Sequence, residues 1–171
     1  MMKTTFLAFT AVTAILIAGH AQASGGLYIT SDYHHSDKAS LASIIFDGHD
    51  NGLSILQSLS DGTERNTLAV NITGNFDGGP LQAAFDAPLT VVGLQPGQLS
   101  QTGNGNAMTF TVNGSGNLFA ASQEGAHNVL TAMITGDSNQ AAVSQAGSGN
   151  TLSFTQNGNG NRLTVIQRSS Y

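Results

Sequence analysis

The residues able to do chemistry are few in this chain of 171 residues, and some of them gather near its start. Histidine and carboxylate side chains are ligands that Zn²⁺ and Cu²⁺ accept in proteins. A loose group of them comprises Asp32, His34, His35, Asp37, His49 and Asp50. Their spacing fits no closed tetrahedral site. We therefore interpret the group as a solvated part of the chain and expect no bound metal.

Asp-Gly pairs are a second candidate, because repeated Asp-Gly turns hold Ca²⁺ in some β-rolls. The pairs are Asp47-Gly48, Asp61-Gly62 and Asp77-Gly78. Such a roll needs an acidic oxygen in nearly every turn, since Ca²⁺ takes about six to eight oxygen ligands. The regular later part of the chain offers a single turn aspartate, Asp137. Ordinary turn chemistry is the favoured interpretation.

Catalytic residues are a third possibility. Glycosidases on β-helical scaffolds need paired carboxylates. Glu124 and Asp137 fall in different turns with no acidic partner, and His127 stands alone in a turn, where we expect it to be solvated. We predict that the chain is not an enzyme and uses no cofactor. Glu124, Asp137 and Arg162 are either gatekeepers against premature aggregation or plain surface charges.

The chain that must position these residues is dominated by an 11-residue repeat. The unit starts are Gln101, Val112, Gln123, Ile134, Gln145, Gln156 and Gln167. A glycine follows two residues after each start but the last: Gly103, Gly114, Gly125, Gly136, Gly147 and Gly158. An asparagine follows five residues after: Asn106, Asn117, Asn128, Asn139, Asn150 and Asn161. Self-similarity at a fixed period takes precedence over any local assignment.

Each unit predicts one half-buried strand. The second and fourth residues after each asparagine are apolar, and this period of two is that of a strand. The predicted core includes Met108, Phe110, Phe119, Leu130, Val143, Leu152, Phe154, Leu163 and Val165. The connections, such as Gln145-Ala-Gly-Ser-Gly-Asn150, have the composition of turns.

Glutamine recurs at alternate unit starts, which indicates a true period of 22 residues. The predicted fold is all-β: a β-solenoid, or cross-β structure, in which each 22-residue coil holds two 11-residue strand-turn units. Coils would stack at about 4.8 Å. The inward amides would then form ladders along the stack. The predicted self-assembly ladder is Gln101, Asn106, Asn117, Gln123, Asn128, Asn139, Gln145, Asn150, Gln156, Asn161 and Gln167.

The rest of the chain divides into further segments. Residues 1–23 have the charge, apolar run and Ala21-Gln22-Ala23 site of a secretory signal peptide, with cleavage after Ala23. We expect an irregular leader over 24–34, degenerate coils with an irregular link over 35–100, regular repeats over 101–167 and a short tail over 168–171. An apparent slip of four residues precedes Asn66.

Composition narrows the class of protein. Charged residues make up 9% of the chain, the formal net charge is −5 and there is no cysteine. Soluble domains typically contain about 25% charged residues. Low charge with high glycine is typical of repetitive or fibrous proteins. The acidity argues against a nucleic-acid partner.

The repeat Gln-x-Gly-x-Gly-Asn, five residues and Gln resembles the curlin repeat of bacterial curli amyloid subunits, most fully over Gln145–Gln156 and Gln156–Gln167. The resemblance implies export through the periplasm and an outer-membrane pore, then assembly into extracellular fibres for biofilm and adhesion. Its implied partners are copies of itself and a nucleator or major-subunit homologue. The acidic charge slightly favours a major subunit, whereas Arg162 and Arg168 favour a nucleator.

A secreted, soluble β-solenoid that binds calcium or a flat surface is the alternative. Outward-facing threonine supports it, with Thr109 and Thr111 in one unit and Thr151, Ser153 and Thr155 two coils on. Val129 and Met133 stand between them, and threonine is also simply a good strand residue.

Overall fold

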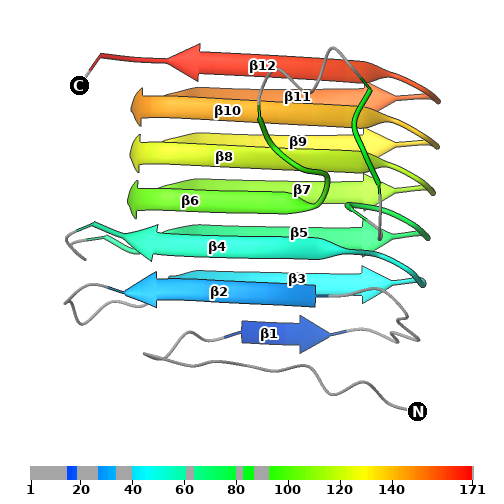
Figure 1. Cartoon of the computed structure of the whole chain (residues 1–171), viewed down its shortest axis with the longest axis horizontal. Coiled ribbons are helices and arrows are strands. Elements are labelled where there is room, and N and C mark those ends of the chain that lie inside the picture. Colours follow the sequence, from blue (N-terminus) through cyan, green and yellow to red (C-terminus); the bar gives the residue numbers. More distant parts are fainter. Residues whose placement is uncertain are drawn as a thin grey trace.

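The chain forms two parallel β-sheets that lie face to face (Figure 1). The computed structural model describes residues 15–18, 27–33, 40–60, 64–79, 83–86 and 93–170, with side chains from residue 40 onward. Within these ranges the regular elements are all strands, and no helix is long and apolar enough to cross a membrane.

Successive strands alternate between the two sheets. The odd sheet contains β1 (Ile15–Ala18), β3 (Leu41–Asp47), β5 (Thr67–Thr73), β7 (Ala107–Asn113), β9 (Val129–Thr135) and β11 (Thr151–Asn157). The even sheet contains β2 (Leu27–Tyr33), β4 (Leu53–Leu59), β6 (Gln98–Asn104), β8 (Leu118–Ala126), β10 (Gln140–Ser148) and β12 (Arg162–Arg168). The predicted β-solenoid is thereby confirmed, with about 5 coils about 22 residues apart.

Strand register follows the predicted period. Gln101 pairs with Gln123, Gln123 with Gln145, and Gln145 with Gln167. Each pair is 22 residues apart. Because paired residues of adjacent strands point to the same face of a sheet, every inward residue lies over an inward residue of the coil before it.

Every coil before β7 is longer than the regular 22 residues. Thr67 of β5 pairs with Leu41 at an offset of 26 residues, and Ala107 of β7 pairs with Thr67 at an offset of 40. In these last two coils the additional residues lie in the connections after β4 and β5, so the strands keep a common register. The first of these connections is where the sequence indicates a slip before Asn66.

The core is a single thin layer between the sheets. Inward residues from the strands β3 to β10 are at most 8% exposed, and the rings of Phe110 and Phe119 stack across it with centroids 4.9 Å apart. Every predicted core residue contributes to this layer. Those of the last coil, Leu152, Phe154, Leu163 and Val165, are only partly buried because no coil covers them.

The connection after β5 crosses the outer face of the even sheet as a strap, defined here by its described residues 83–86 and 93–97 (Figure 1). Phe85 is 6% exposed and packs on Ala120 and Ala142, which point outward from β8 and β10. Small side chains on these two strands leave room for the ring. The irregular link expected from the sequence therefore has a fixed packing partner.

The first strands differ from expectation. Residues 24–34 are predicted to be irregular, yet β2 runs through most of them and pairs in parallel with β4, from Leu27 opposite Leu53 to Tyr33 opposite Leu59. Leu, Tyr, Ile and Thr in this segment favour a strand, and the open edge of β4 offers it a ladder. The predicted cleavage site after Ala23 lies outside the described residues.

Candidate self-assembly surface

A continuous row of glutamine amides runs through the even side of the core. Gln57 Nε2 donates to Gln101 Oε1 at 2.7 Å, and the same bond links Gln101 to Gln123, Gln123 to Gln145 and Gln145 to Gln167 at 2.8–2.9 Å. Every donor points toward the C-terminal end of the stack. The row is therefore polar: its last member, Gln167, has an amide donor with no coil above it.

The same amides tie the two strands of each coil together. Gln123 Nε2 also donates to the carbonyl oxygen of Ala107, the first residue of the odd strand in its coil, at 2.9 Å. Gln101 and Gln145 make the equivalent bond to Thr67 and Val129. Both N–H groups of each inner amide are thus satisfied, which explains how 0–1% exposed glutamines are tolerated in an apolar core.

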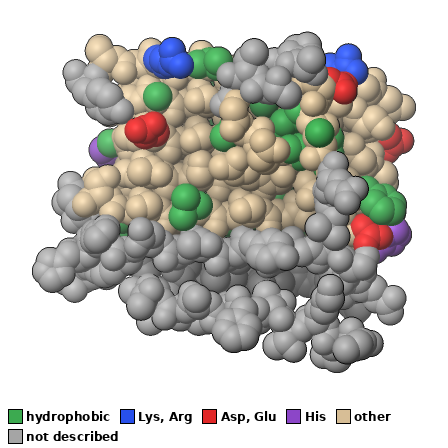
Figure 2. All heavy atoms as spheres, in the orientation of Figure 1, with side chains coloured by type: hydrophobic (Ala, Val, Ile, Leu, Met, Phe, Trp, Pro, Cys, Tyr) green, Lys and Arg blue, Asp and Glu red, His purple; other side chains and the backbone are tan. Residues whose placement is uncertain are grey.

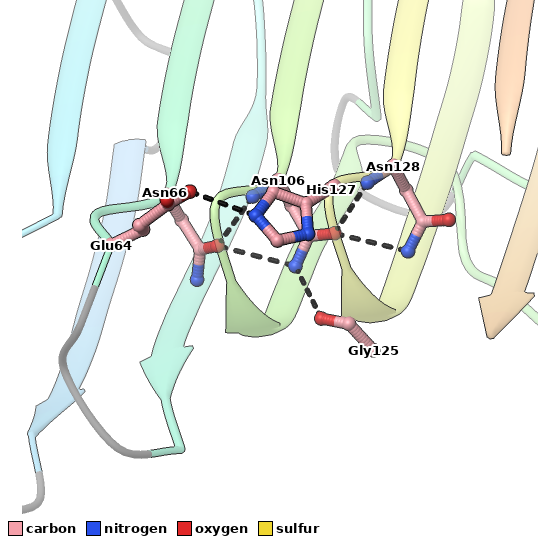
Figure 3. Close-up of polar contacts among 6 residues, drawn as sticks. All are labelled: Glu64, Asn66, Asn106, Gly125, His127 and Asn128. Atoms are coloured by element: carbon pink, nitrogen blue, oxygen red, sulfur yellow. Dashed lines mark hydrogen bonds and ion pairs between the residues drawn. The ribbon is translucent and has the colours of Figure 1, made fainter. Parts of the chain in front are cut away.

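Asparagines form two more rows, one at each edge of the core. In the first, the backbone N and the Nδ2 of Asn128 both donate to Asn106 Oδ1, at 3.1 and 3.0 Å, and Asn106 binds Asn66 in the same way (Figure 3). Asn150 continues this row on Asn128. In these rows the acceptor oxygen, rather than the donor, points toward the C-terminal end.

The second asparagine row contains an acid. It runs through Asn51, Asp77, Asn117, Asn139 and Asn161. Asp77 Oδ1 accepts from the backbone N of Asn117 at 2.8 Å and from its Nδ2 at 3.0 Å, whereas Asp77 Oδ2 is buried without a partner among the described residues. Burial raises the pKa of Asp77 to about 6 despite the opposing bonds from Asn117, and nearby Asp137 adds to the rise.

Sequence reasoning placed Asp77 in a plain turn and left Gln57, Asn51 and Asn66 out of the ladder. The signal was present: Gly74 and Asp77 stand two and five residues after Ile72, as glycine and asparagine do in every regular unit. Asp differs from Asn by one atom and fills the same space. The predicted ladder residues all lie in these rows except Gln156, which lies above Ile134 and whose buried Oε1 has no partner among the described residues.

The six predicted turn glycines let neighbouring coils approach closely. All have φ between 103° and 134°. A Cβ on Gly125 would lie 2.1 Å from the carbonyl oxygen of Gly147 in the next coil, and one on Gly136 would lie 2.3 Å from that of Gly158. Only glycine fits where one backbone passes so near another. At Gly158 the nearest atom is 3.6 Å away, because no coil follows.

Two exposed ion pairs join segments that are far apart in the sequence. His127, expected to stand alone, contacts Glu64 with Nε2 2.9 Å from Oε2 (Figure 3). The sequence could not show this, since Glu64 lies in the lengthened connection after β4. Arg162 of β12 pairs with Asp86 of the strap, and Asp86 also accepts from Gln140 Nε2 at 3.0 Å. Arg162 therefore holds the strap to the last coil.

The metal-ligating candidates do not converge within the described part of the chain. Among the described residues, no group of three or more His, Asp or Glu side chains could hold a metal ion. His49 and Asp50 contact each other at 2.9 Å on the surface. His34, His35, Asp37 and Asp61 lie outside the described residues, and of Asp32 only the backbone is described.

The fold and these rows define a class among the described residues: a parallel β-solenoid whose organised polar feature is a set of amide ladders. Residues 136–168, from the turn before β10 to the end of β12, match the family model described as the curlin associated repeat. The resemblance seen in the sequence is confirmed for this segment, and curlin-repeat proteins are structural rather than enzymatic. No curated protein and no solved structure matches the chain.

Proposed function

We propose that this chain is a secreted structural subunit that stacks end to end into extracellular, curli-like amyloid fibres. The observation that carries the proposal is the unpaired outer edge of the last coil, β11 and β12, among the described residues. β11 and β12 are the last strands of their sheets, so each offers a free edge. Unpaired edges of this kind template the pairing of another chain, and soluble solenoids normally cover them with a polar cap.

Side-chain burial supports the same conclusion. Val143 in β10 is 0% exposed, but its register partner Val165 in β12 is only partly buried. Leu152 and Phe154 in β11 stand in the same relation to Leu130 and Ala132. A further coil would bury these side chains, at a gain of about 25 cal/mol per Å² of apolar surface.

The amide rows give the contact between two stacked copies a direction. By the geometry of the inner coils, an added coil would accept one bond from Gln167 Nε2 and donate two bonds each to the Oδ1 atoms of Asn150 and Asn161. Each bond contributes about 0.5–1.5 kcal/mol net. The end thus presents a donor in one row and acceptors in the others, which favours addition of a chain in the same orientation.

Gly158→Ala tests end-to-end stacking, and it also adds backbone strain inside the monomer, because φ at Gly158 is 104°. The new Cβ would have no atom closer than 3.6 Å in the free chain. In a stacked fibre it would meet the turn carbonyl of the next copy, as a Cβ on Gly136 meets that of Gly158. Gly160→Ala is the control, because Gly160 also has positive φ, 68°, and a Cβ there meets nothing among the described residues within 4 Å. Urea unfolding of both monomers measures the additional strain at Gly158, so that it can be separated from the effect on stacking.

Seeded elongation would be followed for both variants by thioflavin fluorescence and electron microscopy. We expect Gly158→Ala to slow elongation at least about tenfold, which corresponds to about 1.4 kcal/mol of lost binding free energy between stacked copies. Gly160→Ala should elongate near the wild-type rate. Equal rates would overturn stacking on this coil. A wild-type chain that stays monomeric would point instead to a soluble solenoid that binds calcium or a surface.

Export and partners complete the proposal. We infer passage through the periplasm after cleavage at Ala23, exit through an outer-membrane pore, and a role in biofilm matrix and adhesion. A homologous nucleator or major subunit would share the same strand register. The major-subunit role is favoured, since Arg162, one of the two basic residues near the end, is engaged by Asp86 of its own strap. A secretion assay with and without residues 1–23 tests the route.

A further inference from the structure

The outer face of the odd sheet is largely exposed and is uncharged across four neighbouring strands. This bare face is defined by the outward residues of β5, β7, β9 and β11. Every one of these positions is uncharged, and threonine is the commonest residue among them. Thr109, Thr131 and Thr151 are exposed, and so are the apolar Val129 and Met133, at 38% and 47%. The register pairs Thr109 with Thr131 and Val129 with Thr151.

The other side of the solenoid is different. The strap covers part of the even sheet, and Phe85 buries the outward Ala120 and Ala142 beneath it. Charged residues also point outward from the even strands, namely Glu124, Arg162 and Arg168. Figure 2, which views this side, shows charged side chains around its margin. The odd sheet carries one charge on the outward positions of its strands from β3 to β11, Asp47, at the end of β3.

We infer that the bare face is an interface between copies of this chain: the odd sheets of two solenoids pack face to face, so that fibres pair laterally. The inference rests on the proposed function. An uncharged face cannot form ion pairs with a charged partner. Two copies of it can pack together without repulsion between like charges. Threonine, valine and methionine side chains standing on registered strands are also of the kind that interdigitate between packed sheets about 10 Å apart.

The area of the face suits a contact that repeats along a fibre. Four strands spaced at about 4.8 Å, each of seven residues rising about 3.3 Å, span roughly 19 by 23 Å. Packing two such faces would remove on the order of 900 Å² of surface from water per pair of chains. This value is slightly below the roughly 1,000 Å² that an isolated specific interface requires. Along a fibre the contact repeats with every subunit, so the modest areas of successive pairs add up.

Thr131→Lys is the variant that tests the inference. Thr131 is exposed on β9, near the middle of the bare face, and points away from the core. In a face-to-face pair each lysine would be trapped between sheets with no acidic partner on the facing strands. The matched control is Thr102→Lys, which places the same charge at an exposed outward position of β6 on the even sheet.

Two readouts separate this inference from the proposed function. Seeded elongation reports stacking at the fibre end, and mass per length by scanning transmission electron microscopy counts the solenoids in a fibre. We expect wild-type and Thr102→Lys fibres to contain two solenoids. Thr131→Lys should elongate normally and lower the ratio of paired to single fibres by about tenfold or more.

The outcomes that contradict the inference are distinct. Paired Thr131→Lys fibres at low salt, or single wild-type fibres, would overturn it while leaving end-to-end stacking intact. Single wild-type fibres that bind an uncharged polysaccharide or ice crystals through Thr131 would assign the bare face to that partner instead. Absence of any wild-type fibre would overturn the proposed function and this inference together.

Discussion

Replacing Asp77 by asparagine should stabilise the solenoid at neutral pH. At the equivalent place in the row, Asn106 Nδ2 donates to Asn66 Oδ1 and to the carbonyl oxygen of Gly125. Asp77 has its Oδ2 atom where Asn106 has Nδ2. Oδ2 lies beside the carbonyl oxygen of Gly114, since the Cβ position of Gly74 is 2.7 Å from Oδ2 and 1.5 Å from that carbonyl oxygen. The buried Oδ2 is thus placed among acceptors, which a carboxylic acid satisfies and a carboxylate does not.

The sign of the effect follows from the pKa. The pKa of Asp77 rises from 3.8 to about 6, so the native state holds this proton over a range where the unfolded state has lost it. The contribution of Asp77 to the free energy of unfolding therefore falls as pH rises from about 4 to 6, and stays low above that. At 1.36 kcal/mol per pKa unit the loss is at most about 3 kcal/mol, and solvent at the adjacent turn screens part of it.

The assay is urea unfolding of freshly prepared monomer at pH 4 and pH 7. Asp77→Asn should raise the free energy of unfolding at pH 7 by about 2–3 kcal/mol and change it little at pH 4. Asp47→Asn, which removes the same charge from an exposed position on β3, is the control and should show no such difference. A stabilisation that is equal at both pH values, or none at either, would refute the proposed protonation of Asp77.

Three further predictions follow from the rows, the turns and the strap. Removing an open ladder group, by Asn161→Ala or Gln167→Ala, should slow seeded elongation several-fold more than the outward Thr164→Ala, and equal rates for all three would contradict the ladder. Ser138→Gly should raise the free energy of unfolding by about 0.5–1 kcal/mol, because Ser138 has φ 58° where regular units place glycine; chemical denaturation measures this. Phe85→Ala should lower it by about 2 kcal/mol and expose the strap to proteolysis, and unchanged proteolysis would argue against packing on Ala120 and Ala142.

The periodic part of the fold could be predicted from the sequence because one rule fixes every coil. Once glycine and asparagine recur every 11 residues, the inward residues and the rows follow from strand geometry alone. Met108, Phe110 and Leu130 needed no knowledge of distant contacts to be placed in the core. The period of 22 residues, visible only as glutamine at alternate unit starts, then set which strands pair.

The aperiodic features could not be predicted in the same way. Phe85 lies in a proline-interrupted stretch with no period, and its partners Ala120 and Ala142 occupy positions that alternation assigns to solvent. The pair of Asp86 with Arg162 joins segments whose separation no local pattern encodes. Such contacts depend on where a connection of arbitrary length returns to the sheet.

The account rests on stacking of strands across molecules, and fibre X-ray diffraction of Ser24–Tyr171 after quiescent incubation at neutral pH tests this most directly. Assembly by end-to-end addition predicts a meridional reflection at about 4.7–4.8 Å and an equatorial reflection near 10 Å. A chain that remains monomeric and gives no such reflections would contradict the account, since the open edges of β11 and β12 would then not recruit another copy.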